Sequence, residues 1–164
     1  MVVFATRERH TNIQIPIQMS GVILQKIEKC KCLGITLDQQ LSFREHIEVL
    51  LSKLKLIIPM LAKLENSGVP RNQTLSVYKA LFIPYITYGL VLFGRTYTTL
   101  IGKLQVAQNN AVRAMLGYRK DENVTELYAK HQLLNIKHLY KYEFNSIQFN
   151  VALFENKGAV MTNH

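Results

Sequence analysis

The spacing of the apolar residues changes near Asp38, and this change restricts the possible folds more than any other feature of the sequence. Residues 12–18 alternate isoleucine with polar residues, which is typical of a half-buried strand. Pro16 within that stretch favours an edge strand. After Asp38, apolar residues recur every three or four positions, as they do on one face of a helix. The sequence therefore predicts an α+β fold that is mainly α.

Two more short strands are predicted in the N-terminal part, across residues 22–27 and 32–37. Three short strands, one of them carrying a proline, are close to the lower limit for a sheet that is stable alone. We therefore expect residues 1–38 to be a piece of a larger antiparallel sheet.

About five helices are predicted after Asp38. Ser42 and Glu45 have the spacing of a capping box, and so do Asn123 and Glu126. The predicted ranges are 43–64, from 70 through at least 82, 98–116, 127–134 and 136–155. Gly117 is placed to end the third helix in a left-handed conformation. We expect one helical domain over 39–157 and a frayed tail over 158–164.

Apolar spacing assigns an inner face to each of the long helices. For the first helix the face comprises Phe43, Ile47, Leu50, Leu51, Leu54, Ile57, Ile58, Leu61 and Leu64. For the second it comprises Leu75, Tyr78, Leu81 and Phe82. For the last it comprises Tyr140, Phe144, Ile147, Val151 and Phe154.

The positive charge of the chain is concentrated in its middle. The 20 Lys and Arg against 11 Asp and Glu give a net charge of +9. No acidic residue occurs between Asn66 and Lys120, and the basic residues there are Arg71, Lys79, Arg95, Lys103, Arg113, Arg119 and Lys120. Such a stretch fits a surface that faces phosphates, and it fits an ordinary solvated basic face equally well.

The cysteines and the N-terminus indicate an intracellular protein. Cys30 and Cys32 have neither the spacing of a zinc site nor a disulfide framework, so reduced thiols are expected. Charged residues at 7–9 interrupt the start before an apolar signal segment can form. The uncharged run at 80–94 is shorter than the roughly 20 residues of a membrane-spanning helix, so a buried core element is favoured and no membrane partner is expected.

Three segments together resemble the region after the catalytic core of non-LTR (LINE, jockey-like) retrotransposon reverse transcriptases. The first is Cys32-Leu33-Gly34-Ile35-Thr36-Leu37-Asp38, followed by Leu41-Ser42-Phe43 and His46-Ile47. The second is Tyr78-Lys79-Ala80-Leu81-Phe82-Ile83-Pro84, followed by Tyr88-Gly89 and Phe93-Gly94. The third is Leu104, then Gln108-Asn109-Asn110-Ala111-Val112-Arg113, with Gly117 after it.

The resemblance implies the end of a palm, with a primer-grip-like hairpin in 1–38, and a helical thumb-like domain in 39–157. It implies that Lys29, Lys31 and Gly34 lie near a primer. The other nucleic-acid-binding candidates are Arg71, Lys79, Lys103, Arg113, Arg119 and Lys120. The expected partner is an RNA or DNA template–primer duplex, possibly together with the palm and fingers of a parent polymerase, in the nucleus or cytoplasm.

Catalysis by this chain is not expected. Polymerases hold two metal ions about 3.5–4 Å apart with carboxylates. The family's Phe-Ala-Asp-Asp signature is absent, the aspartates are Asp38 and Asp121, and Met1 is expected to fall just after the catalytic block. We therefore predict no catalytic residue and no cofactor here, although the parent enzyme would use Mg²⁺. The alternatives are a helical protein-interaction module and a decayed open reading frame without activity.

Four tyrosines of the basic stretch also have two interpretations. Tyr78, Tyr85, Tyr88 and Tyr97 could stack on nucleic-acid bases or pack in the core. Because the residues around most of them are uncharged, core packing is favoured.

Overall fold

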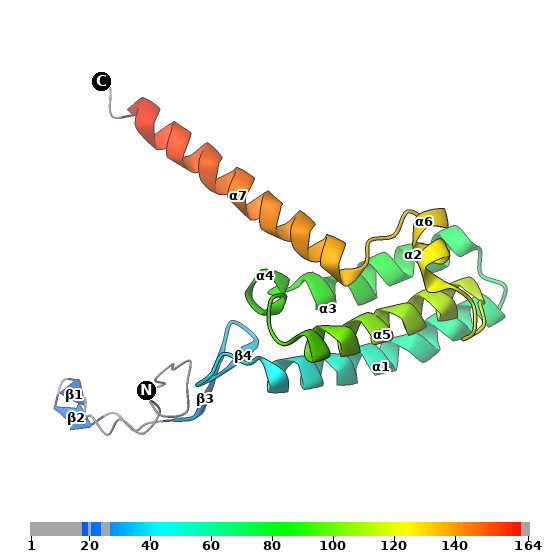
Figure 1. The fold of residues 1–164 in the computed structure, drawn as a ribbon, viewed down its shortest axis with the longest axis horizontal. Helices are drawn as coiled ribbons and strands as arrows, with labels where there is room; N and C mark the ends of the chain where they lie inside the picture. Colours follow the sequence, from blue (N-terminus) through cyan, green and yellow to red (C-terminus); the bar gives the residue numbers. More distant parts are fainter. Residues whose placement is uncertain (1–17, 20, 24–26, 162–164) are drawn as a thin grey trace. The chain divides into compact units, whose positions relative to one another are not determined.

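A computed structural model describes residues 18–19, 21–23 and 27–161 of the chain. Strands come first and helices follow, so the mainly α, α+β class is confirmed (Figure 1). The chain divides into two compact units, Met1–Leu50 and Leu51–His164. The predicted strand at 12–18 lies almost wholly outside the described residues.

The first unit contains two antiparallel strand pairs. β1 (Gln18–Met19) pairs with β2 (Val22–Ile23), and β3 (Lys29–Cys32) pairs with β4 (Ile35–Asp38). Among the described residues these pairs form two separate sheets. The prediction of one continuous strand across 32–37 is therefore wrong, because a turn divides it.

Leu33 and Gly34 form that turn, between the paired residues Cys32 and Ile35. Their φ angles are 47° and 81°, and a two-residue hairpin turn of type I′ requires positive φ at both positions. Glycine adopts this conformation readily, whereas leucine rarely does. Gly34, which was expected inside a strand, thus lies at the tip of a hairpin beside a leucine that is 84% exposed.

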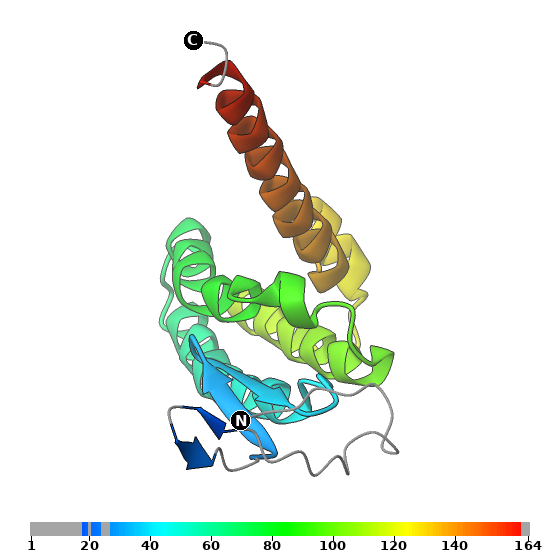
Figure 2. The same ribbon diagram turned by 90° about the vertical axis from the view of Figure 1, so that its left-hand side faces the viewer.

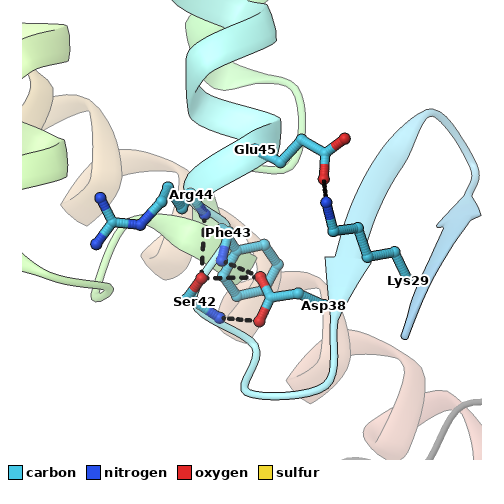
Figure 3. A network of polar contacts seen from close by, with 6 residues as sticks. All are labelled: Lys29, Asp38, Ser42, Phe43, Arg44 and Glu45. Atoms are coloured by element: carbon cyan, nitrogen blue, oxygen red, sulfur yellow. Dashed lines mark hydrogen bonds and ion pairs between the residues drawn. The ribbon is translucent and has the colours of Figure 1, made fainter.

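Asp38 organises the turn from β4 into the first helix (Figure 3). Its carboxylate accepts backbone N–H groups of Gln40, Ser42 and Phe43 at 2.9–3.0 Å, and the hydroxyl of Ser42 at 2.9 Å. Burial opposes ionisation, but these hydrogen bonds outweigh it and hold the pKa of Asp38 below its ordinary value.

At the start of α1 (Arg44–Asn66), the hydroxyl of Ser42 accepts the N–H of Arg44 at 3.3 Å, and the described contacts of Ser42 and Glu45 differ from those of the predicted capping box. The N–H of Ser42 donates to Asp38, and the carboxylate of Glu45 pairs with Nζ of Lys29 at 2.7 Å (Figure 3). Spacing along the chain could not reveal either longer-range partner.

The predicted inner face of α1 is confirmed. Its buried residues are Phe43, Ile47, Leu50, Leu54, Ile57 and Leu61. Pro59 lies inside α1, which continues for two more turns before Asn66 ends it.

The second helical segment of the sequence contains a π-turn. α2 (Arg71–Val77) continues through η2 (Tyr78–Phe82) into α3 (Ile83–Thr87). Pro84 has no N–H to donate to the carbonyl four residues before it, and the wider turn is found at this point. The π-turn changes which residues face inward, so Leu81, assigned to the inner face, is 44% exposed.

Gly89, with φ of 73°, separates α3 from the short α4 (Leu90–Phe93). One row of buried side chains passes through these helices, namely Tyr78, Phe82, Ile86, Leu90 and Phe93. The uncharged run at 80–94 therefore contributes to the core, as predicted. None of the described helices is long and apolar enough to cross a membrane.

Three helices complete the second unit. α5 (Thr98–Leu116) ends at Gly117, whose φ of 71° confirms the predicted left-handed cap. Asn123 caps α6 (Val124–Lys130) by accepting the N–H of Thr125 at 3.0 Å. α7 (Ile136–Met161) continues beyond residue 155, where the predicted last helix ends.

Among residues 136–152, the part of α7 whose burial the structure describes, the buried side chains are Ile136 and Leu139 in the first turns. The helix contacts α3, α4 and α5, and its later turns project away from those helices (Figure 2). The exposed apolar residues of these later turns are Tyr142, Phe144, Ile147, Phe149 and Val151. The predicted inner face is thus wrong for Phe144, Ile147 and Val151. The side chain of Phe154 is not among those that the structure describes.

Candidate nucleic-acid interface

The segment from Asn66 to Lys120, which contains no acidic residue, is called the acid-free stretch. Its basic residues are distributed over several elements of the second unit. Arg71 begins α2, Lys79 lies in η2, Lys103 and Arg113 lie in α5, and Arg119 and Lys120 follow α5. All except Arg113 are exposed. Individual contacts show which of these residues lie close together.

The end of α5 brings several cations together. Arg113 and Lys120 line one hollow together with Lys55 of α1. Tyr118 also lines this hollow, and its hydroxyl accepts a hydrogen bond from Nζ of Lys130 at 3.3 Å. The same ammonium lies 6.0 Å from the centre of the Tyr118 ring.

Arg71 joins this group through His131. Burial lowers the pKa of His131 first, and the positive charges of Lys130 and then Arg71 lower it further. Both cations therefore lie close enough to the imidazole to act on it. In agreement, α5 contacts α2 and α6 (Figure 1). We call Lys55, Arg71, Arg113, Lys120 and Lys130 the α5-end cluster.

Acidic groups are present around the α5-end cluster but do not line its hollow. Asp121 pairs with Arg119 at 3.5 Å, with both side chains largely exposed. The Glu122 carboxylate accepts the backbone N–H of Arg119 at 3.3 Å. The Glu65 side chain lies beside Gly117. The cluster thus keeps an excess of positive charge.

Lys55 and Lys130 were missing from the predicted site. Both lie outside the acid-free stretch, and the linear charge pattern that selected the other residues could not include them. Tyr118 was missed because a single tyrosine carries no signal in the sequence. Folding places Lys55 and Tyr118 in one hollow with Arg113 and Lys120, and it places Lys130 against Tyr118.

No contact that the structure describes joins Lys79 or Lys103 to the α5-end cluster. Lys79 and Lys103 are exposed on η2 and α5. Arg119 forms the exposed pair with Asp121. Their predicted role stays a prediction.

The first unit contains the three residues that the resemblance assigned to a primer. Lys29 and Lys31 lie in β3 and Gly34 lies in the turn after it. The hydrogen bond to Glu45 and its charge raise the pKa of Lys29, so this ammonium already has an acceptor. Lys31 is exposed, and its role stays a prediction.

The prediction of core packing is confirmed for one of the four tyrosines. Tyr78 is 1% exposed, whereas Tyr85, Tyr88 and Tyr97 are 42%, 58% and 58% exposed. The prediction is wrong for these three, because η2 and Gly89 redirect the helix faces in this segment. Nζ of Lys53 lies 5.5 Å from the centre of the Tyr85 ring.

The Gln108–Arg113 motif has a structural role at its first two positions. The buried Gln108 amide donates to the Tyr78 hydroxyl at 3.1 Å and to the Leu134 carbonyl at 2.9 Å. Asn109 Oδ1 accepts the Tyr128 hydroxyl at 3.1 Å. These two side chains connect α5 to η2, to α6 and to the segment before α7.

The described residues of the chain contain no evident metal site. Within them, no three His, Cys, Asp or Glu side chains lie together as ligands of one ion would.

Known proteins resemble this chain over somewhat less than two thirds of its length. It is 31% identical over 105 residues to the probable RNA-directed DNA polymerase from transposon BS of Drosophila melanogaster, covering 63% of this chain and 12% of that protein. It is 26% identical over 106 residues to the RNA-directed DNA polymerase from mobile element jockey of the same species, covering 62% and 11%. It is 25% identical over 104 residues to the probable RNA-directed DNA polymerase from transposon X-element, covering 62% and 12%.

No protein-family profile matches the sequence, and no solved structure matches it significantly. The chain is a distant homologue of transposon RNA-directed DNA polymerases, with jockey-like elements among its relatives. It spans 11–12% of the length of these curated relatives.

Proposed function

We propose that this chain is a non-catalytic, thumb-like segment of a transposon RNA-directed DNA polymerase, and that it binds the backbone of a template–primer duplex through the α5-end cluster. The observation that carries the proposal is the gathering of Lys55, Arg113 and Lys120 around one hollow, with Lys130 hydrogen-bonded to Tyr118 in its wall, in a chain homologous to such polymerases. Phosphates dominate the affinity of proteins for duplexes, and clustered Lys and Arg supply the counter-charge.

The two aspartates support a non-catalytic role. Asp38 accepts hydrogen bonds from the turn into α1, and Asp121 pairs with Arg119. Each therefore has a local structural partner rather than a second carboxylate with which to share a metal ion. We expect no template-dependent incorporation in a primer-extension assay with Mg²⁺ or Mn²⁺, and incorporation above background would refute this part of the proposal.

Binding is tested with a fluorescent RNA–DNA hybrid duplex in a titration over salt concentration. Affinity should be independent of sequence and should fall by roughly 0.9 log units per phosphate contact for each tenfold rise in salt, the value for B-form DNA. The double variant Lys120→Glu and Lys130→Glu should weaken binding and reduce the salt dependence.

Lys137→Glu with Lys141→Glu is the matched control, because both lysines are exposed on α7 and the charge change is the same. Equal loss of affinity in both double variants would mean that any basic surface of the chain suffices. The α5-end cluster would then not be the interface.

A helical protein-interaction module is the second candidate function. The exposed apolar side chains of α7 favour it, since large contiguous apolar surfaces often mark interaction sites. Failure of the wild-type chain to bind the duplex even at low salt would favour this alternative.

A further inference from the structure

The hollow at the end of α5 is open to solvent and is lined by residues from separate parts of the second unit. It has a volume of about 390 Å³. Its lining residues are Lys55, Ile58, Pro59, Asn110, Arg113, Ala114, Tyr118 and Lys120. Three of them are cationic and none is acidic, so the hollow is suited to an anion.

Arg113 is held in the wall of this hollow by one of its own donors. Its Nη2 donates to the backbone carbonyl of Glu122 at 3.1 Å. Its Nε is buried and has no hydrogen-bond partner among the residues that the structure describes. Because buried donors are almost always paired, with protein groups or with ordered water, this N–H has hydrogen-bonding capacity that the described residues do not use.

The two lysines of the hollow are also available to a ligand. Neither Lys55 nor Lys120 forms an ion pair within the described part of the chain, and both are exposed. They reach the hollow from α1 and from the loop after α5, so an anion inside it would have positive charge on more than one side.

The remaining walls strengthen these charges. Ile58, Pro59 and Ala114 form an apolar wall, and charges interact more strongly beside a wall of low polarity than in open water. Asn110 and the hydroxyl of Tyr118 add groups that can donate hydrogen bonds to oxygen atoms.

We propose that this hollow binds a single phosphate group of a nucleic-acid strand, with the guanidinium of Arg113 and the ammonium groups of Lys55 and Lys120 as counter-charges. The proposal rests on the proposed function and makes it more specific. A bound phosphate at this point would fix the register of the strand on the protein, which diffuse attraction to exposed cations does not do.

The first test compares two neutralised residues of α5 in the full chain. Arg113→Gln and Lys103→Gln remove the same charge from the same helix, but only Arg113 lines the hollow. We expect Arg113→Gln to lower affinity for the hybrid duplex by about tenfold or more and Lys103→Gln by less than about threefold. Lys120→Gln should also lower the affinity for the duplex by more than Lys103→Gln does. Because Lys120 is an exposed loop residue, this variant tests the hollow even if Arg113→Gln misfolds.

The second test follows the Nε–H group of Arg113 directly. The Arg113 Nε–H signal in nitrogen-edited NMR should shift on titration with inorganic phosphate at constant ionic strength, and Lys120→Gln should weaken that response. Two results would contradict the phosphate site. One is an Arg113 Nε–H signal that does not shift with phosphate, and the other is an equal loss of duplex affinity in Arg113→Gln and Lys103→Gln. If the wild type still binds the duplex, neither result contradicts the proposed function. A wild type that binds no duplex refutes the proposed function, and the phosphate titration then still reports on the hollow separately.

Discussion

The side-chain amide of Gln108 donates a hydrogen bond to the hydroxyl of Tyr78, 3.1 Å away, and so joins α5 to the π-turn η2. Both side chains are buried. Burial raises the pKa of Tyr78 to about 12, so its hydroxyl is neutral at physiological pH. Gln108 of the third motif thus contacts Tyr78, the first residue of the second, and the two motifs form one structural connection.

Gln108→Leu should destabilise the protein by about 1–3 kcal/mol, because it leaves the Tyr78 hydroxyl and the Leu134 carbonyl without their donor. Adding Tyr78→Phe should recover part of the loss, since removing both partners leaves no unpaired hydroxyl. Asn110→Leu, an exposed amide on the same helix, should change stability by less than about 0.5 kcal/mol. Urea denaturation measures all three, and equal effects of Gln108→Leu and Asn110→Leu would contradict the assignment.

Local chemistry made the C-terminal cap of α5, the N-terminal cap of α6 and the inner face of α1 predictable. Gly117 and Asn123 act on the backbone within a few residues of themselves, so the sequence pattern reveals them. The face of α1 follows from spacing alone. The π-turn η2 and the hairpin tip at Leu33 were not predictable in this way, because both go against the preferences of the residues that form them.

The candidate site was predicted only in part because it is assembled from distant segments. Arg113 and Lys120 belong to the acid-free stretch, but Lys55 reaches them from α1 and Lys130 from the end of α6. Linear charge patterns do not contain that information. The apolar spacing of α7 predicted a buried face in the same way, although spacing cannot say whether another element covers it.

Leu33 occupies a left-handed conformation that costs a β-carbon-bearing residue about 1–2 kcal/mol. Asn is favoured at this position of a two-residue hairpin turn, so Leu33→Asn should stabilise the β3–β4 hairpin. We expect amide hydrogen exchange of residues 29–38 to become about fivefold slower for each kcal/mol gained. Lys31→Asn, in the paired strand β3, should have the opposite effect, and faster exchange in Leu33→Asn would refute the strain argument.

Two glycines of the second unit should respond oppositely to alanine. At Gly117, φ is 71° and a β-carbon would overlap the Glu65 side chain, so Gly117→Ala should destabilise by about 1–2 kcal/mol. At Gly102, inside α5, a β-carbon would meet nothing within 4 Å, so Gly102→Ala should stabilise by about 0.5–1 kcal/mol. Thermal unfolding measures both, and shifts of the same sign would contradict the described end of α5.

His131 should make the stability of the free protein depend on pH. Burial, Lys130 and Arg71 lower its pKa in the folded state from the ordinary value of 6.5. Between that lowered pKa and 6.5 the unfolded chain binds more protons than the folded one, so stability should fall as the pH drops below about 6.5.

Melting temperatures from pH 7.5 downwards test this dependence, with His138→Gln as a control because His138 is exposed on α7. The His131→Gln variant should lose less stability on acidification than the wild type, whereas His138→Gln should follow the wild type. Arg71→Gln should also reduce the loss, since it removes one of the charges that oppose protonation. If His131→Gln kept the full pH dependence, Arg71 and Lys130 would not act on this imidazole, and Arg71 would no longer belong to the α5-end cluster.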